Sequence, residues 1–447
     1  MAACVGGRAI GAHACVRRVV IDSRDAGPGA LFVALPGTRT DGHRFVDAAY
    51  ARGAAGVLVG RSEPVGGRPA VLVADPGAAL VRLAACERRA LEATVVGITG
   101  SVGKTTTKDL AAAVLGRRFA VTASPASFNN QLGLPLTVLA ADERTEVLVC
   151  EIGAGVVGEI ASLCEVARPH VGIVTVVGPA HVETFGSPAA IARAKGELVE
   201  SLPPSGLAIL NADDPVVSRF DRRTRASVLR YGQGAAADVR AEDVRLTADA
   251  RAVFRLADGM KSAEVELRIP GRHVVTDALA AAACGLALGV PLDDCAEGLG
   301  TAAAPPGRMQ VLEGAGGIVV WNDAYNANPT SVTAALHAVG ALSNGAGRIA
   351  VLGPMAELGR TSRIEHERIG RLAARSGLAR LIAVGPEGRW IVRGAVGSGM
   401  RSDRASWSSG VEEALREVRR AVRPGDVVLV KASRAVGLDR LAEALRP

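Results

Sequence analysis

The sequence predicts an α/β fold with three domains, and three observations support that prediction. The chain has 447 residues, which is too long for a single hydrophobic core. Through its middle, β-branched apolar runs alternate with helical segments, a pattern typical of a parallel sheet covered on both faces. The segment Ala302-Ala-Ala-Pro-Pro-Gly-Arg308 contains paired prolines, which would stop a helix and indicate a linker. We therefore expect domains at residues 1–92, 93–303 and 304–447.

The first domain should be a small α/β unit that handles substrate. Short apolar runs alternate there with Gly and Asp turns, and the expected strands are 19–21, 31–35, 57–59 and 71–73. The residues that precede these runs show no sign of a first helix.

The central domain should hold a mostly parallel sheet, with strands at 94–99, 147–151, 171–177 and 207–210. Alternating residues between 238 and 269 predict an antiparallel extension, and a helix is expected over 274–288. In the last domain, each apolar run is followed by a helix-like segment, and these runs are 318–321, 349–352, 381–384 and 427–430. That alternation predicts a second, Rossmann-like unit.

Composition narrows the class of protein. Apolar residues make up 49% and charged residues 22% of the chain, as in globular proteins. No run reaches the roughly 18 apolar residues of a membrane span, and residues 1–10 lack the basic and then apolar pattern of a secretory signal. We expect a cytoplasmic protein without membrane insertion. Because no exposed heptad or apolar stripe is visible, we also expect a monomer.

Charge and cysteine content argue against two kinds of site. The formal charge is +7, but Arg and Lys are spread along the chain and aromatic residues are only 3%, so no stacking platform for nucleic acid is indicated. A solvated basic surface that favours anionic substrates is the simpler interpretation. The seven cysteines are scattered and never form a C-x-x-C pair. We therefore expect neither disulfides nor a zinc site, and interpret the cysteines as small buried hydrophobes.

A phosphate-binding loop is the strongest local motif. The strand at 94–99 runs directly into Gly100-Ser-Val-Gly-Lys-Thr-Thr106, and a helical segment follows. Glycines let backbone N–H groups turn inward, the helix N-terminus favours anions, Lys104 can reach the β and γ phosphates, and Thr105 can hold Mg²⁺. Ile98 stands where the general G-x-x-x-x-G-K motif has glycine, so this is a shortened variant. The alternative of a glycine-rich turn that binds nothing is disfavoured by the strand before it and the helix after it.

Further residues point to metal-assisted chemistry beside this loop. Glu151 closes a buried strand, where open α/β sheets present ligand-binding groups, and its carboxylate together with Thr105 suits a hard cation. Lys195 lies on the apolar face of an expected helix and should point inward. His181 follows the strand at 171–177 and should lie in the same layer. Structural alternatives stay open for all three residues: an ion-paired or capping Glu151, a His181 with only a structural role, and a Lys195 whose ammonium reaches solvent.

Motifs that follow in order resemble the Mur ligase and folylpolyglutamate synthetase superfamily over nearly the whole chain. The nucleotide signature is Gly97-Ile-Thr-Gly-Ser-Val-Gly-Lys-Thr-Thr-Thr-Lys108. The other matching segments are Asp22-Ser-Arg24, Asp41-Gly-His43, Asn129-Asn-Gln-Leu-Gly-Leu-Pro135, Glu151-Ile-Gly-Ala154, Pro179-Ala-His-Val-Glu-Thr-Phe-Gly-Ser187, Asn322-Asp-Ala-Tyr-Asn-Ala-Asn-Pro329 and Met355-Ala-Glu-Leu-Gly359. The last two most resemble the family members that add D-alanyl-D-alanine to UDP-N-acetylmuramoyl-tripeptide.

The resemblance implies an ATP-dependent ligase that forms a C–N bond through an acyl phosphate. A carboxylate resists attack by an amine until it carries a better leaving group, and ATP supplies one. ATP and a pair of Mg²⁺ ions are the implied cofactors. The implied metal ligands are Thr105, Glu151, His181 and Lys195, with the lysine carbamylated by CO₂ so that it becomes an anion. Lys104, Lys195 and His181 are the implied catalytic residues.

The same resemblance distributes ligand contacts over the three domains. Contacts to ATP are implied for Gly100, Ser101, Val102, Gly103, Lys104, Thr105 and Thr106, and across the domain cleft for Arg308, Asp323, Asn326 and Asn328. The UDP-sugar end of the tripeptide substrate would be bound by Ser23, Arg24, Asp41 and His43, and its peptide end by Asn129 and Asn130. The Asn-rich segment could also be only a turn.

Three departures from the family pattern keep alternatives open. Val274 and Asp277 stand where relatives usually have asparagines, which bears on contacts to the base of ATP, and Pro354 stands where Asp is usual. The first two leave room for a protein of another class, an inactive paralogue that binds nucleotide as a regulatory module. Among enzymes, the alternatives are a Mur-type ligase that adds a single amino acid and a folylpolyglutamate synthetase.

Overall fold

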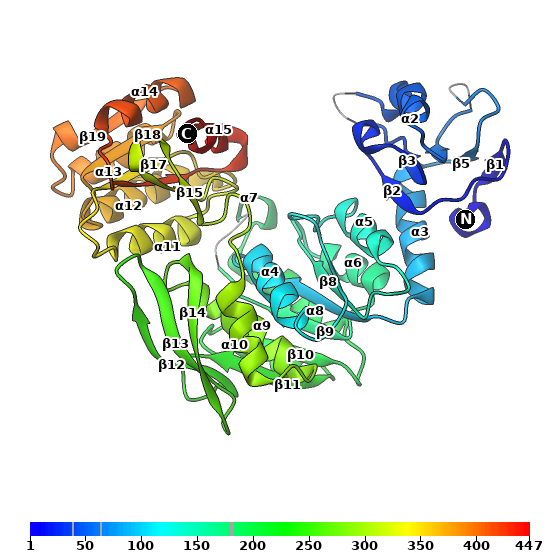
Figure 1. Cartoon of the computed structure of the whole chain (residues 1–447), viewed down its shortest axis with the longest axis horizontal. Coiled ribbons are helices and arrows are strands. Elements are labelled where there is room, and N and C mark those ends of the chain that lie inside the picture. The colour runs from blue at the N-terminus through cyan, green and yellow to red at the C-terminus, as the bar shows by residue number, and fades with distance from the viewer. Residues whose placement is uncertain (38–39, 63–64, 179–181) are drawn as a thin grey trace.

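Three sheets, taken in chain order, divide the molecule into N-terminal, central and C-terminal parts (Figure 1). The computed structural model describes residues 1–37, 40–62, 65–178 and 182–447. In Figure 1 the N-terminal and C-terminal parts stand apart from each other, and each adjoins the central part. The predicted α/β architecture is confirmed.

The N-terminal part is built on a five-stranded sheet of order β1-β5-β4-β3-β2, in which only β1 runs antiparallel. Its strands are β1 (Arg8–Ile10), β2 (Arg18–Val20), β3 (Ala30–Val33), β4 (Gly56–Val59) and β5 (Ala70–Leu72), and its helices are α1 (Ala2–Val5), α2 (Val46–Ala51) and α3 (Pro76–Ala90). Asp75 caps α3, and this helix runs from the N-terminal sheet towards the central part (Figure 1).

Three expectations for this part were wrong. The short helix α1 is present, and Cys4 in α1 is joined to Cys86 in α3 by a disulfide, with Cα atoms 6.4 Å apart. Cys15 is exposed, whereas the other four cysteines are buried as expected. The disulfide partners are 82 residues apart in sequence, so their spacing could not reveal that the fold brings α1 against α3.

The central part holds a nine-stranded sheet of order β14-β13-β12-β11-β10-β9-β6-β8-β7. Its strands are β6 (Thr94–Thr99), β7 (Val121–Ala123), β8 (Val147–Glu151), β9 (Val171–Val174), β10 (Leu207–Asn211), β11 (Ser227–Gly232), β12 (Val239–Leu246), β13 (Arg251–Ala257) and β14 (Ser262–Pro270). The strands from β6 to β12 form the parallel part of this sheet. β13 and β14 pair antiparallel beyond β12, and these three strands form the predicted antiparallel extension.

Helices cover both faces of the parallel strands, which explains their continuous apolar sequences. The helices are α4 (Lys104–Leu115), α5 (Gly133–Ala140), α6 (Glu159–Ala167), α7 (Val182–Phe185), α8 (Pro188–Glu200), α9 (Val274–Ala287) and α10 (Leu292–Thr301). On β6, Val96 packs in the cluster that contains α4 and α9, and Val95 packs in the cluster that contains α5, α6 and α8. Burial on both faces favours the strand over any exposed conformation of this segment.

The C-terminal part has a six-stranded sheet of order β15-β16-β20-β17-β18-β19, parallel except for the edge strand β15. Its strands are β15 (Gln310–Glu313), β16 (Val319–Asn322), β17 (Arg348–Leu352), β18 (Arg380–Val384), β19 (Ala405–Ser408) and β20 (Val427–Lys431). Its helices are α11 (Pro329–Gly340), α12 (Ser362–Arg375), α13 (Gly388–Val396), α14 (Val411–Ala421) and α15 (Asp439–Ala444).

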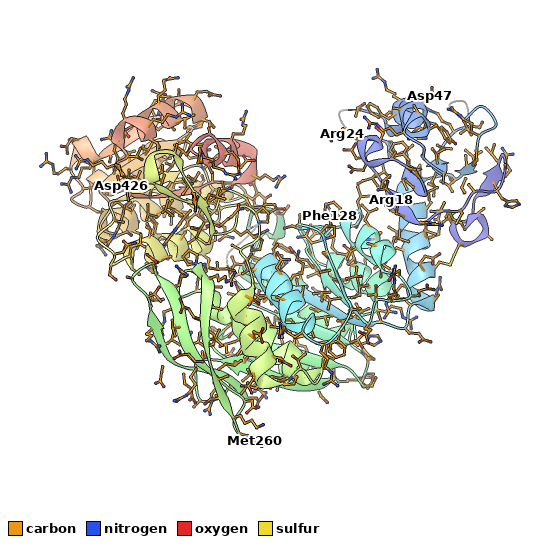
Figure 2. The ribbon with its side chains drawn as sticks, in the orientation of Figure 1. Arg18, Arg24, Asp47, Phe128, Met260 and Asp426 are labelled. Carbon is orange, nitrogen blue, oxygen red and sulfur yellow. A yellow bond between two sulfur atoms is a disulfide. The ribbon has the colours of Figure 1, made fainter. Side chains whose placement is uncertain are left out.

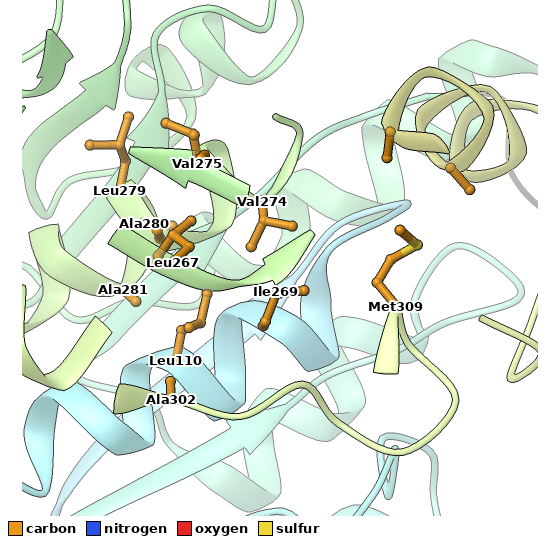
Figure 3. Close-up of a cluster of buried hydrophobic side chains, with 14 of the residues drawn as sticks. Leu110, Leu267, Ile269, Val274, Val275, Leu279, Ala280, Ala281, Ala302 and Met309 are labelled. Atoms are coloured by element: carbon orange, nitrogen blue, oxygen red, sulfur yellow. The ribbon is translucent and has the colours of Figure 1, made fainter. Parts of the chain in front are cut away.

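An apolar cluster joins the central and C-terminal parts. Figure 3 shows Leu110 of α4 beside Ile269 of β14 and Val274 of α9, with Met309 nearby just past the linker. Met309 is 3% exposed although it lies in a connecting segment. Its burial removes apolar surface from water and so holds the start of the C-terminal part against the central sheet. Among the described residues, no helix has the length and apolar character needed to cross a bilayer.

Candidate active site

The phosphate loop lies between β6 and α4, and two glycines define its path. Gly100 has a φ of 150°, and a Cβ there would lie 2.0 Å from Oγ1 of Thr175. Gly103 has a φ of 84°, and a Cβ there would lie 2.2 Å from Oδ1 of Asp277. Both positions therefore require glycine. The loop leads directly into the N-terminus of α4, where the helix dipole favours a bound phosphate.

Lys104 begins α4, and its ammonium bends back across the loop. Its Nζ donates a 2.9 Å hydrogen bond to the carbonyl of Gly100. Burial lowers the pKa of Lys104, whereas the nearby carboxylate of Glu151 raises it. Since one carbonyl engages only one of three N–H donors, the ammonium can also bind phosphate oxygens.

Thr105, Glu151 and Asn129 form a polar cluster where α4 begins and β8 ends. Oγ1 of Thr105 donates to Oε2 of Glu151 at 2.6 Å, and Nδ2 of Asn129 donates to Oε1 at 2.7 Å. Glu151 is 1% exposed. The oxygens of Thr105 and Glu151 are of the kind that Mg²⁺ prefers. In the described part of the chain no three His, Cys, Asp or Glu residues group as a metal site.

Lys195, on α8, lines the same cavity as the phosphate loop and is 2% exposed. Its Nζ lies 5.5 Å from the centre of the Phe185 ring. Burial and the nearby ammonium of Lys104 together lower the pKa of Lys195 to about 7, against the opposing charges of Glu197 and Glu159. The predicted inward orientation is therefore observed, and the alternative of a solvent-exposed ammonium is wrong. His181, the other predicted ligand of a second metal, lies outside the described residues.

The C-terminal part closes this site with residues near its strand ends. Asp323 follows β16 and Lys431 ends the neighbouring strand β20. Nζ of Lys431 donates to Oδ2 of Asp323 at 2.6 Å, and the backbone N–H of Met309 donates to Oδ1 at 3.1 Å. Arg308 stacks on Tyr325, with 4.1 Å between its guanidinium carbon and the ring centre.

Three predicted asparagines line the cavity but also serve local structure. Asn328 caps α11 in a reciprocal capping box with Ser331. Asn326 accepts a 2.9 Å hydrogen bond from the backbone of Ala327. The side chain of Asn130 accepts backbone hydrogen bonds at the start of α5. Asn326 and Asn328 therefore shape the turn before α11 and also line the cavity, as the predicted contacts to ATP require.

One cavity of about 800 Å³ joins the phosphate loop to the C-terminal part. Its lining includes the predicted residues Ser101, Val102, Gly103, Lys104, Thr105, Thr106, Asn129, Asn130, Glu151, Lys195, Arg308, Asp323, Asn326 and Asn328. Gly100 is not part of the lining and supports the loop from behind. A volume of this order holds a nucleotide-sized ligand.

The four residues predicted to bind the UDP-sugar end lie in the N-terminal part and do not line this cavity. Arg24 follows Ser23, its side chain is 82% exposed, and Figure 2 shows it on the side that faces the C-terminal part. The ring of His43 is buried, with Nε2 accepting from the N–H of Gly60 at 2.8 Å and Nδ1 donating to Asp41 at 2.7 Å. His43 therefore holds its loop in place.

Sequence reasoning missed Lys431 and Ser127, both of which line the cavity. Lys431 carried a usable signal, because it ends a buried apolar strand in the same way as Glu151. Ser127 carried none, because it lies in irregular chain between β7 and α5.

Asp277, a departure noted in the sequence, lies against the phosphate loop. Its Oδ1 accepts a 3.3 Å hydrogen bond from Oγ1 of Thr107, and the residue is 8% exposed. Burial raises the pKa of Asp277 to about 8, although the bond from Thr107 and the charge of Arg308 oppose this. The carboxyl group is therefore mostly neutral at pH 7 and, like an asparagine amide, can donate a hydrogen bond.

A phosphate loop and a buried lysine that meet beneath a second α/β unit define the class of this protein, a multidomain P-loop enzyme. The chain belongs to the Mur ligase family. Family models match at residues 16–87 (Mur ligase family, catalytic domain), 98–285 (Mur ligase middle domain) and 307–434 (Mur ligase, glutamate ligase domain). The protein is thus an ATP-dependent ligase, as the sequence predicted.

Curated relatives and solved structures agree with this membership. UDP-N-acetylmuramoyl-tripeptide--D-alanyl-D-alanine ligase of Mycobacterium tuberculosis is 44% identical, over 96% of this chain and 91% of the relative. The Escherichia coli protein of the same name is 34% identical, over 99% of this chain and 96% of its own.

Among solved structures, MurF from Acinetobacter baumannii superposes with a TM-score of 0.84 at 31% identity, covering 96% of this chain and 93% of that one. MurF ligase from Thermotoga maritima in complex with ADP gives 0.81 at 30% identity, covering 96% and 97%. Folylpolyglutamate synthase of Mycobacterium tuberculosis gives 0.64 at 16% identity, with 83% and 95% covered, a likeness of fold alone.

Proposed function

We propose that this enzyme joins D-alanyl-D-alanine to UDP-N-acetylmuramoyl-tripeptide with ATP, as the names of its relatives state for those proteins. The observation that carries the proposal is the convergence of Lys104, Glu151 and Lys195 in one cavity lined by both the central and the C-terminal part. A phosphate loop alone would suit many reactions. A loop facing a second α/β unit also offers room for a peptide carboxylate and an acceptor amine.

The reaction proceeds in two transfers. An oxygen of the tripeptide carboxylate attacks the γ-phosphorus, so a new P–O bond forms as the bond to ADP breaks. The amine of the dipeptide then attacks the acyl carbon, the C–O bond to phosphate breaks, and the amine loses a proton. Lys104 offsets negative charge on the γ-phosphate during the first step, and the C-terminal part excludes water that would hydrolyse the acyl phosphate.

The residues present fit the expected Mg²⁺. Thr105 and Glu151 place oxygens within 2.6 Å of each other beside the phosphate loop, and such oxygens are ligands for a hard cation. When bound there, the cation would neutralise phosphate charge. Asn129 orients Glu151 through its second oxygen.

Lys195 fits a carbamylated residue. Only a neutral amine attacks CO₂, and the lowered pKa of about 7 leaves a substantial neutral fraction at physiological pH. Forming the N–C bond releases a proton and converts the side chain into an anion, which offsets the cost of a buried ammonium beside metal ions. Incubation with ¹³C-bicarbonate should give a carbamate carbon signal that Lys195→Arg lacks.

The substrate ends map onto different parts of the chain in this proposal. Ser23, Arg24, Asp41 and His43 serve the UDP-sugar end, supported by the exposed guanidinium of Arg24 on the side that faces the C-terminal part. Asn129 and Asn130 serve the peptide end from the cavity wall. Asp323, Asn326 and Asn328 contact ATP from the opposite wall. We further propose that the enzyme acts as a monomer in the cytoplasm, where ATP and its substrates are available.

An ADP-release assay on the purified chain tests this proposal. Turnover should require ATP, Mg²⁺, UDP-N-acetylmuramoyl-tripeptide and D-alanyl-D-alanine together. Replacing the dipeptide by glutamate, lysine or meso-diaminopimelate should abolish it. Turnover that ignores the dipeptide would refute the assignment, and ATP binding without turnover would favour an inactive paralogue.

A further inference from the structure

Ser127 lies at the centre of a hydrogen-bonded chain that links the phosphate loop to the C-terminal part. Its Oγ lies 3.0 Å from Oγ1 of Thr105, and Nη2 of Arg308 donates to it at 2.8 Å. Thr105 in turn donates to Glu151 at 2.6 Å. Arg308 is 181 residues from Ser127 in sequence, so this contact crosses between separate parts of the fold.

The chemistry of Arg308 and Glu151, the first and last residues of this hydrogen-bonded series, fixes the direction of every hydrogen bond in it. A guanidinium can only donate, so Arg308 uses Ser127 as an acceptor. The hydroxyl hydrogen of Thr105 is committed to Glu151, so Ser127 must donate its own hydrogen to Thr105. Ser127 is the one member of this chain that accepts from the C-terminal side and donates to the phosphate loop. An alanine at this position could do neither.

The loop that carries Ser127 is held in place by a buried cation. Lys108 is 2% exposed, and its Nζ donates to the carbonyls of Ser124 at 2.6 Å and Ala126 at 3.0 Å. Ala126 has a φ of 47°, a conformation that an L-residue holds only when its surroundings impose it. Because Lys108 lies on α4, it fixes the position of Ser127 relative to the helix that follows the phosphate loop.

Arg308, at the other end of this hydrogen-bonded series, is also held in a fixed position. Arg308 stacks on Tyr325 at 4.1 Å, and Arg434 lies on the same ring at 4.9 Å. All three residues belong to the C-terminal part or its linker. When this part docks, the guanidinium of Arg308 therefore arrives in a fixed position at Ser127.

We propose that Ser127 is a positioning residue that couples docking of the C-terminal part to nucleotide binding. By donating to Thr105, it leaves a defined lone pair of that hydroxyl oxygen free for a cation beside the phosphates. This inference rests on the proposed function only in assigning ATP to the phosphate loop. It adds a residue of no assigned role and a direction of communication: Arg308, Ser127, Thr105, Glu151.

A double-mutant cycle tests the coupling. Binding of a non-hydrolysable ATP analogue with Mg²⁺ is measured by calorimetry for the full-length wild type, Ser127→Ala, Arg308→Ala and the double variant. We expect Ser127→Ala to weaken binding about tenfold in the wild-type background. In the Arg308→Ala background it should weaken binding hardly at all, because the hydrogen bond from Arg308 to Ser127 is already absent there. Equal losses in both backgrounds would overturn the proposal.

Two further variants separate positioning from general damage. Ser127→Thr keeps the hydroxyl and should restore binding, whereas Ser162→Ala removes a serine hydrogen bond on α6 outside the cavity and should change nothing. In the ligase assay, Ser127→Ala should lower kcat more than it raises KM for the dipeptide. A non-additive binding cycle in a protein that fails to use D-alanyl-D-alanine would support this coupling while refuting the proposed reaction.

Discussion

Nζ of Lys431 lies 2.6 Å from Oδ2 of Asp323, and their side chains are 2% and 13% exposed. The pair joins two adjacent parallel strand ends at the wall of the cavity. Two charges removed from water are stable only while they face each other, because each alone would pay its full desolvation cost.

Breaking this pair should destabilise the C-terminal part. We expect Lys431→Met to lower the free energy of unfolding by about 3 kcal/mol, because it leaves the Asp323 carboxylate buried without its cation. Adding Asp323→Asn should recover part of the loss. Urea unfolding of both variants measures this, and a double variant less stable than the single one would contradict the explanation.

Gly100→Ala should weaken nucleotide binding strongly. The added Cβ would lie 2.0 Å from Oγ1 of Thr175, and φ is 150°, so the loop must move. We expect affinity for ATP to fall on the order of a hundredfold, as a misplaced phosphate site loses several N–H contacts. Gly399→Ala is the matched control, since φ there is 95° but nothing lies within 4 Å of the new atom. Similar affinity in both variants would argue against a clash at the loop.

Asp277→Asn should stabilise the protein at neutral pH. Burial raises the pKa of Asp277 from 3.8 to about 8. Between these values the unfolded chain releases this proton while the folded protein keeps it, so stability falls as pH rises through that window and is level above it. An amide removes the penalty, on the order of 2 kcal/mol at pH 7 after allowing for relaxation.

Thermal melts from pH 4 to pH 8 measure this effect. The gain in Asp277→Asn should grow towards pH 8. Asp293→Asn, at an exposed aspartate on α10, should show no such trend. A gain that is independent of pH would mean that titration of Asp277 is not its source.

Arg88→Ala should lower the free energy of unfolding several times more than Arg89→Ala. It is 6% exposed and donates to the carbonyls of Ala167, Leu91 and Arg168 at 2.7, 3.0 and 3.2 Å, tying α3 to the end of α6. Arg88→Ala leaves those carbonyls unpaired and should cost about 3 kcal/mol. Arg89→Ala, at an exposed position on the same helix, should cost about 0.5 kcal/mol or less. Equal costs in urea unfolding would show that the bonds contribute little.

Segments with strong local patterns were predicted accurately. β6 and β8 begin and end at the expected residues, because continuous β-branched runs have one good solution, a strand buried on both faces. Strands such as β7 and β11 were missed, since their half-buried sequences resemble loops. The placement of Lys104, Thr105 and Glu151 followed from the same patterns, because each residue lies at the end of a predictable element.

By itself, the sequence determined which local elements form and which polar residues end them, because backbone preferences and apolar periodicity act over a few neighbouring residues. Only the tertiary structure decided that Ser127 meets Arg308, that Lys431 pairs with Asp323, and that the carboxyl group of Asp277 is buried against Gly103. Such contacts join residues more than a hundred positions apart, and their energies depend on distance and burial. Those quantities exist only once the separate parts have packed together.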